Sequence, residues 1–217
     1  MSKVVQRSVA SPVDLAVGPF PRLCQAYIMM GKVFNHHHGG SATSEFEHFQ
    51  VASQLYNDSS TLTTKIIDEA ADYPDYLAMA AALALTFSAV YALCKPYSSP
   101  TNGQSFSGDE AVKMQTQAID GLHFVSNSVV DFTVHVNNAA PSAHDLDRIS
   151  PLVMDSLYSA ASYHAWQVRE NSDHNSQMAL DSIRHSLQRL GARWRNAAEY
   201  LRFLEAQEFH YAVRTGG

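Results

Sequence analysis

The stretch LAMAAALALTFSAVYALC, residues 77–94, decides the fold, because it runs for eighteen residues without a charged side chain. Asp75 and Lys95 flank it on the two sides. Eighteen apolar residues are the lower limit for a helix that crosses a membrane. However, seven of the eighteen residues are alanine, which adds little to the free energy of insertion into lipid. The stretch therefore predicts the central helix of a folded domain, packed on all sides and without membrane contact.

Helical periodicity continues on both sides of this stretch, with apolar residues mostly at spacings of three, four and seven. Before it, one helix is expected to begin at Pro19–Pro21 and to end near Gly39–Gly40. The next helix is expected to begin after Ser44, because Ser44 and Glu47 have the spacing of a capping box. Both helices precede the alanine-rich stretch in the chain.

The alanine-rich helix should begin at Pro74 and end before Lys95–Pro96, because proline disrupts a helix interior. Four further helices are predicted by the same periodicity, at about residues 107–136, 150–164, 173–191 and 193–208. We therefore predict an all-α fold, a compact array of about seven amphipathic helices in antiparallel helix pairs. Residues 1–18 are expected to form a flexible N-terminal segment, and residues 19–217 a single all-α domain.

Composition excludes several classes of protein. The 217 residues carry a formal net charge of −6, so the chain should not bind nucleic acid through bulk charge. The two cysteines, Cys24 and Cys94, cannot form a disulfide framework or a four-cysteine zinc site, and we interpret both as buried reduced thiols. Residues 184–214 carry an excess of arginine, which indicates either solvated helix faces or a basic surface for an acidic partner.

Sequence motifs of catalysis are absent. The chain has no G-x-S-x-G, Walker, G-x-G-x-x-G or H-E-x-x-H pattern, and neither cysteine has a charged or histidine residue three or four positions away, on its own face of a helix. We therefore predict no catalytic residue, no cofactor-binding residue and no metal ligand, and we expect the protein not to be an enzyme. The expected activity is binding.

A second interpretation is a helical-bundle enzyme or metal-binding protein that uses Glu45, His48, Asp120 and His123. Each carboxylate precedes its histidine by three residues, the spacing found in di-iron bundles. His36–His38 is a run of consecutive residues whose side chains point to different faces of a helix, and we interpret it as favourable cation placement at a helix C-terminus. By residue type alone, further carboxylate ligands could come from Asp131, Asp155 and Glu199.

Aromatic residues are abundant, with ten Phe, ten Tyr and two Trp. In helical domains such side chains usually fill the core between helices, although they can also line a small-molecule pocket or a partner groove. Two groups fall on or beside the later predicted helices, namely Tyr158, Tyr163 and Trp166, and then Trp194, Tyr200 and Phe203.

Four segments of the chain carry a resemblance to a known family. They are PRLCQA at residues 21–26, the run 83–98 with its Lys-Pro-Tyr turn, the pattern SPLV followed by LYSAA at 150–161, and residues 179–205. In this order they resemble the regulatory region of fungal zinc-cluster transcription factors, in which the middle two segments correspond to helices and the last to the terminal helix pair. The resemblance spans roughly residues 12–210.

The resemblance implies a helical regulatory domain that tunes transcription by binding a small-molecule effector or a coregulator protein. It also implies a location in the nucleus or cytoplasm, and association with a second copy or with related regulators. The zinc cluster of that family needs six cysteines, whereas this chain has two. Direct DNA contact by this chain is therefore not expected, and the family's regulatory region offers no catalytic residues to transfer.

Overall fold

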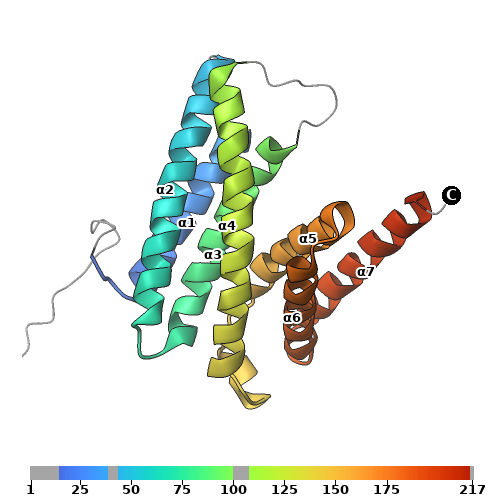
Figure 1. The fold of residues 1–217 in the computed structure, drawn as a ribbon. Helices are drawn as coiled ribbons and strands as arrows, with labels where there is room; N and C mark the ends of the chain where they lie inside the picture. The colour runs from blue at the N-terminus through green and yellow to red at the C-terminus, as the bar shows by residue number, and fades with distance from the viewer. Residues whose placement is uncertain (1–14, 39–43, 100–107, 216–217) are drawn as a thin grey trace, which may run out of the picture. The chain divides into compact units, whose positions relative to one another are not determined.

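The computed structural model describes residues 15–38, 44–99 and 108–215, with side chains to residue 210. The described residues contain seven α-helices and one short 3-10 helix, and no strand (Figure 1). The predicted all-α fold of about seven helices is therefore confirmed. In chain order the elements are α1 (Pro19–His38), α2 (Glu45–Ala71), α3 (Tyr76–Ser98), α4 (Asp109–Ala139), the 3-10 helix η1 (His144–Arg148), α5 (Val153–Asn171), α6 (His174–Gly191) and α7 (Arg195–Thr215).

The helices divide into two compact units. Unit 1 is Met1–Gly121 and unit 2 is Leu122–Gly217, so the boundary falls within α4. In unit 1, α3 packs against α1 and α2, and in unit 2, α5, α6 and α7 pack against one another. The single domain expected over residues 19–217 stays a prediction.

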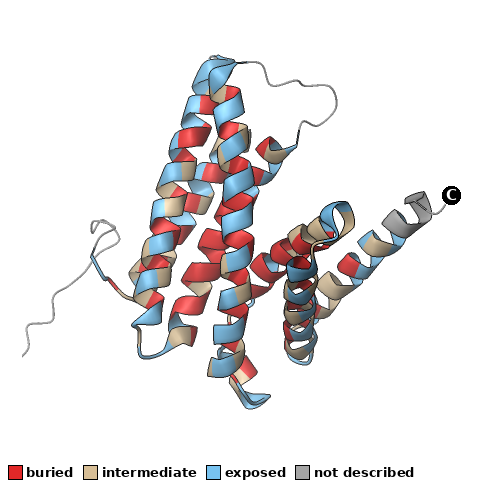
Figure 2. Ribbon diagram, in the orientation of Figure 1, coloured by how far each residue is buried: buried red, intermediate tan, exposed pale blue. Residues whose placement is uncertain are grey.

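Helix α3 supplies most of the core of unit 1 (Figure 2). It contains the alanine-rich stretch, in which Met79, Leu83 and Phe87 are fully buried. By length and composition this is also the one described helix that could cross a membrane, and 83% of its most apolar window is buried inside the protein. A core helix passes the same test, and the burial agrees with the interpretation of this stretch as a central packed helix.

Two predicted helix starts have the expected capping geometry. The Ser44 hydroxyl accepts a hydrogen bond from the Glu47 backbone N–H at 3.2 Å, as the capping-box pattern predicts. The Asp173 carboxylate caps α6 by accepting hydrogen bonds from the N–H groups of Asn175 and Ser176, at 3.2 and 3.1 Å. Each cap satisfies backbone donors that have no partner inside the first helical turn.

The predicted end of α3 before Pro96 is wrong, because the helix continues to Ser98. Proline has no N–H, so its presence leaves the carbonyl of Ala92, four residues earlier, without the usual helical donor. The ring of His37 occupies this position, with its Nε2 atom 3.1 Å from the Ala92 oxygen. Because a carbonyl only accepts, His37 Nε2 carries the proton, and this bond from α1 lets the last turn of α3 form.

The described end of the predicted N-terminal segment is bonded to the helices. Of residues 1–18, residues 1–14 lie outside the described part of the chain, while the Gly18 N–H donates to Glu69 Oε1 at 2.6 Å. Gly18 has a φ of 85°, a left-handed conformation that residues with a Cβ rarely adopt. Glycine at this position therefore lets the chain turn into α1 while it donates to α2.

The arginines of residues 184–202 make contacts within unit 2. Arg184 pairs with Glu208, and Arg193 pairs with Asp147. Arg189 donates to Asn137 Oδ1 at 2.9 Å and to the Ala140 carbonyl. These arginine contacts favour the structural interpretation of the basic segment over a surface for an acidic partner.

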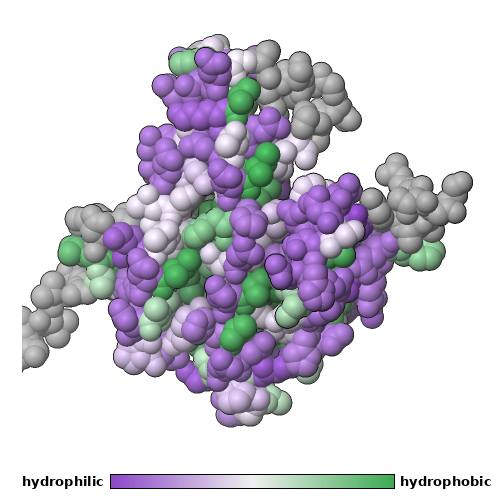
Figure 3. Space-filling model, viewed as in Figure 1, coloured by the Kyte–Doolittle hydropathy of each residue, from purple (hydrophilic) through white to green (hydrophobic). Residues whose placement is uncertain are grey.

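On the face drawn in Figure 3, hydrophilic residues predominate and hydrophobic residues form separate spots.

Candidate functional site

Unit 2 contains a cleft of about 850 Å³ between the second half of α4, α5 and the start of α6. This volume is in the range of small-molecule sites in proteins. Most of the residues that line it are polar. The lining consists of His123, Asn127, Val130, Asp131, Tyr163, His164, Gln167, Asn171, Asp173, Asn175, Ser176, Met178, Ala179 and Ser182.

Two polar stripes with helical spacing form much of this lining. On α4 the stripe is His123, Asn127 and Asp131, and on α5 it is Tyr163, Gln167 and Asn171. Residues four apart lie on the same face of a helix, so each stripe presents three polar side chains in a row. The cleft is therefore formed by two facing rows of hydrogen-bonding groups.

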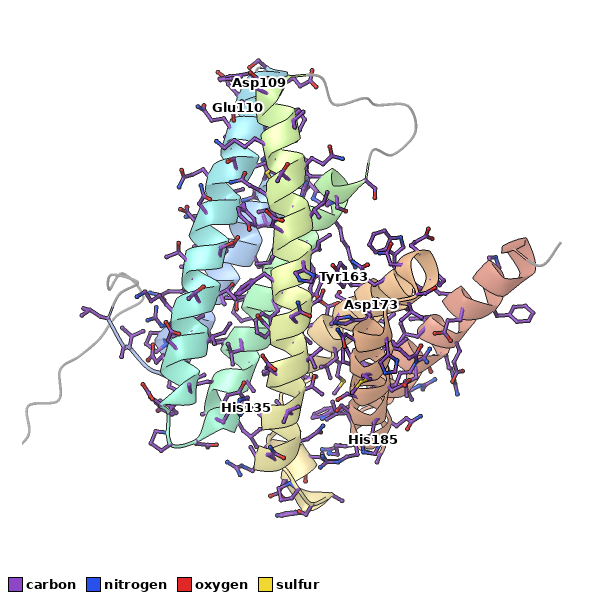
Figure 4. All side chains as sticks on the ribbon, viewed as in Figure 1. Asp109, Glu110, His135, Tyr163, Asp173 and His185 are labelled. Atoms are coloured by element: carbon purple, nitrogen blue, oxygen red, sulfur yellow. The ribbon has the colours of Figure 1, made fainter. Side chains whose placement is uncertain are left out.

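The turn between α5 and α6 closes one end of the cleft. Ser172 adopts a left-handed conformation with a φ of 52°, and its N–H donates to the Val168 carbonyl at 3.0 Å. This geometry ends α5, and α6 begins after only one further residue, Asp173. Figure 4 labels Tyr163 on α5 and Asp173 at the start of α6. The short turn thus places Asn171 and Asp173 together in the cleft lining.

A buried histidine lies at the inner part of the lining. His164 is 3% exposed, and its Nδ1 lies 3.1 Å from the Ser176 hydroxyl. Burial lowers the pKa of His164, so the ring is neutral at neutral pH. A hydrogen bond from the Ser176 side chain lowers the pKa of Asp173, which stays ionised. Ser176 thus lies between the His164 imidazole and the Asp173 carboxylate. In a hydrolase triad the histidine lies between the serine and the carboxylate, so these three residues do not have the order of a triad.

Side-chain hydrogen bonds fix the rim of the cleft. The Tyr163 hydroxyl accepts from Gln167 Nε2 at 2.8 Å and lies 3.3 Å from His123 Nδ1. His123 Nε2 in turn lies 3.2 Å from Asn127 Nδ2. This network connects the α4 stripe to the α5 stripe before any ligand is bound. Such preorganisation lowers the entropy cost of binding.

The charge of the lining selects between ligand classes. The fourteen lining residues, all of them described, include the carboxylates of Asp131 and Asp173 but no lysine or arginine. An anionic ligand such as a phosphate would find no cation there and would be repelled by the two carboxylates. The same groups can bind hydroxyl, amide and amine groups of a neutral or positively charged molecule.

The four residues of the metal interpretation lie in separate surroundings. Glu45 is exposed at the start of α2, and His48 contacts α1 and α3 within unit 1. Asp120 is exposed on the unit 1 part of α4, whereas His123 belongs to the cleft of unit 2. Among the described residues no group of three or more His, Cys, Asp or Glu side chains is arranged to hold a metal ion.

The further carboxylate candidates have different positions. Asp131 lines the cleft, and Asp155 is exposed on α5. Glu199 on α7 pairs with Arg202 at 3.0 Å. Only Asp131 therefore belongs to the candidate site.

The aromatic groups serve both expected purposes. Tyr163 lines the cleft, while Tyr158 stacks on Tyr200 with ring centroids 4.7 Å apart and thereby joins α5 to α7. Phe203 packs edge-on against both of these rings. Trp166 is 45% exposed and Trp194 is half-buried, and neither lines the cleft.

Sequence reasoning missed most residues of the cleft, including Asn127, Gln167, Asn171 and Asn175. The signal that could have indicated them is the run of polar residues four apart on each of two helices. On a single helix this pattern is also typical of a solvent-exposed face. Comparison of the chain with protein-family models, with curated proteins and with solved structures finds no match.

Proposed function

We propose that this chain is a regulatory domain that binds a polar small molecule in the cleft of unit 2. The observation that supports the proposal is the pair of polar stripes on α4 and α5, which line one cleft of about 850 Å³. The ligand class that fits the lining is a neutral or positively charged molecule with several hydroxyl or amine groups, such as a polyol, an amino sugar or a polyamine.

In this proposal the bound ligand regulates by stabilising one packing of unit 2. Because the cleft is lined by three helices, a molecule that contacts all three favours the arrangement in which they are correctly spaced. A ligand at a hundred times its Kd would stabilise that state by about 2.7 kcal/mol. A change of this size is enough to alter how strongly unit 2 holds a coregulator.

The resemblance to fungal zinc-cluster regulators gives the proposal its biological setting. We propose that the chain acts in the nucleus or cytoplasm as an effector-binding regulator of transcription, without direct DNA contact. Its output would be the binding of a coregulator protein, a second copy or a related regulator. The chain has two cysteines, whereas the DNA-reading zinc cluster of that family needs six, and this supports a role separate from that cluster.

Calorimetry and thermal unfolding with four sets of compounds test this function: polyols, amino sugars, polyamines and anionic sugar phosphates. We expect binding from the first three sets only. The double substitution Asn127→Ala with Asn171→Ala, which removes two exposed amides of the lining, should weaken binding at least tenfold. Gln188→Ala, an exposed amide on α6 outside the lining, is the matched control and should leave the Kd unchanged.

Two results would contradict the proposed function. One is the absence of binding by any compound of the first three sets. The other is a ligand whose affinity is equal in the wild type, the double variant and Gln188→Ala. Tight binding of a sugar phosphate at the same residues would refute the charge argument and would leave the cleft itself as the site.

A further inference from the structure

Three helices of unit 1 bring two histidines to one buried tyrosine. His36 on α1 and His48 on α2 each direct their Nε2 atom at the hydroxyl of Tyr97 on α3, at 2.6 and 2.8 Å. The two imidazole rings stack, with centroids 4.3 Å apart and an interplanar angle of 21°. Tyr97 is only 4% exposed, so this constellation lies at the edge of the core and not in free solvent.

The hydrogen-bonding capacity of these groups limits their protonation. A tyrosine hydroxyl donates one hydrogen bond, so at least one of the two Nε2 atoms carries a proton and donates to the hydroxyl oxygen. Burial and the neighbouring His48 lower the pKa of His36 to about 4, and burial raises the pKa of the Tyr97 hydroxyl. At neutral pH the histidine ring is therefore neutral and the phenol protonated.

His37, which follows His36 in α1, makes its hydrogen bond to a different group. His37 donates its Nε2 proton to the Ala92 carbonyl at 3.1 Å, the position made vacant by Pro96. That bond holds the last turn of α3, which carries Tyr97, against α1. His37 therefore acts as a structural support for Tyr97, and two imidazoles remain directed at the hydroxyl.

We propose that His36 Nε2, His48 Nε2 and Tyr97 Oη form a binding site for a divalent transition metal ion of the borderline class, such as copper(II) or zinc. Neutral imidazole nitrogen is a preferred ligand of these ions, and a phenolate oxygen supplies a negative charge. Each Nε2 atom already lies within hydrogen-bonding distance of the Tyr97 oxygen, and coordination requires the ion to enter among these three donor atoms. Because one of its three ligands is a tyrosine, this site is of a different kind from the groups of His, Cys, Asp and Glu side chains considered for the metal interpretation above.

Binding exchanges one proton for the metal ion. A histidine whose Nε2 carries a proton first shifts that proton to Nδ1, so that both Nε2 atoms offer a lone pair. The ion then takes lone pairs from the two Nε2 atoms and the phenol oxygen, and the phenolic proton leaves to solvent. The shared hydrogen bonds are replaced by three coordination bonds that join α1, α2 and α3. The site would therefore stabilise unit 1 and would be independent of the cleft in unit 2.

Titration of the full, untagged chain with copper(II) or zinc ions tests the site. We expect one ion bound per chain, with release of one proton, which calorimetry in buffers of different ionisation enthalpy measures. His36→Gln and His48→Gln should each weaken binding by more than about tenfold. Tyr97→Phe keeps the buried ring and should abolish both the proton release and the visible phenolate-to-copper charge-transfer band.

Two control substitutions separate this site from histidines elsewhere. His185→Gln, on an exposed position of α6, should leave binding unchanged. His38→Gln tests whether the ion is instead held by the exposed end of the histidine run. Binding that survives both His48→Gln and Tyr97→Phe, or that is lost in His38→Gln alone, would overturn the proposal, as would the absence of binding by the wild type.

Discussion

Replacing Glu69 by glutamine should strongly destabilise unit 1, because the carboxylate of Glu69 compensates the buried charge of Arg22. The two side chains are 8% and 2% exposed, and Arg22 Nε lies 2.7 Å from Glu69 Oε2. The other carboxylate oxygen accepts from the Gly18 N–H at 2.6 Å. A glutamine has one oxygen and one NH₂ group, so its NH₂ group would face either the Arg22 Nε–H or the Gly18 N–H, and two hydrogen-bond donors would then oppose each other.

The expected loss is about 3–5 kcal/mol, the usual cost of removing one partner from a buried ion pair. Arg22 also donates to Gln25 Oε1 at 2.9 Å and to the Leu15 carbonyl at 2.7 Å. These bonds hold the guanidinium in place, so it cannot move to solvent to recover its hydration. For a unit of about a hundred residues, each kcal/mol corresponds to roughly 4 °C, which gives a fall in Tm of roughly 12–20 °C.

Differential scanning calorimetry and urea unfolding measure this loss. The matched control is Glu199→Gln, which removes a carboxylate paired with Arg202 at 3.0 Å, where the two side chains are 35% and 70% exposed. That substitution should cost less than about 1 kcal/mol, because water screens exposed pairs. The reasoning is refuted if Glu69→Gln and Glu199→Gln have the same small effect. The double variant Arg22→Met with Glu69→Leu should recover much of the lost stability.

Three further outcomes follow from unit 1. A Cβ at Gly121 would lie 2.6 Å from Tyr56 Cε2. Gly121→Ala should therefore lower the free energy of unfolding by up to about 2 kcal/mol, despite the better helix propensity of alanine. Urea unfolding should show a smaller loss when the same substitution is made in a Tyr56→Ala background. The pKa of His36 is about 4 when folded and 6.5 when unfolded, so the unfolded chain takes up the proton first. Stability should therefore fall by roughly 1–2 kcal/mol, allowing for solvent screening, as the pH drops from 6.5 to 4, and urea unfolding across this range should show a smaller fall for His36→Gln. Burial raises the pKa of the Cys94 thiol to about 12, so in timed alkylation the half-buried Cys24 should react first, and equal rates would contradict this.

Local sequence chemistry predicts the helices and their starts well. Ser44 and Asp173 cap their helices because a short polar side chain can reach backbone donors two or three residues ahead, an interaction that is visible in the sequence. The end of α3 could not be predicted in this way. Pro96 would end an isolated helix, but His37, distant in the sequence, supplies the hydrogen bond that the Ala92 carbonyl lacks.

The candidate site was less accessible to sequence reasoning for a related reason. The polar stripes on α4 and α5 look like two solvated helix faces when each helix is considered alone. They become a site only because packing within unit 2 brings them to one cleft, where His123 and Tyr163 meet. His36, His48 and Tyr97 come from three helices, and no spacing along the chain connects them.

Residues 21–26, one of the segments on which the proposed resemblance to fungal regulators rests, contribute to packing in this structure. Arg22 makes the buried ion pair with Glu69, and Ala26 is fully buried in unit 1. Selection for packing is sufficient to explain such a segment in any chain with this helix arrangement. The packing role of this segment therefore does not indicate a particular effector. In the proposed function the polar stripes of unit 2 select the ligand, so the compound sets above have to be tested on this chain itself.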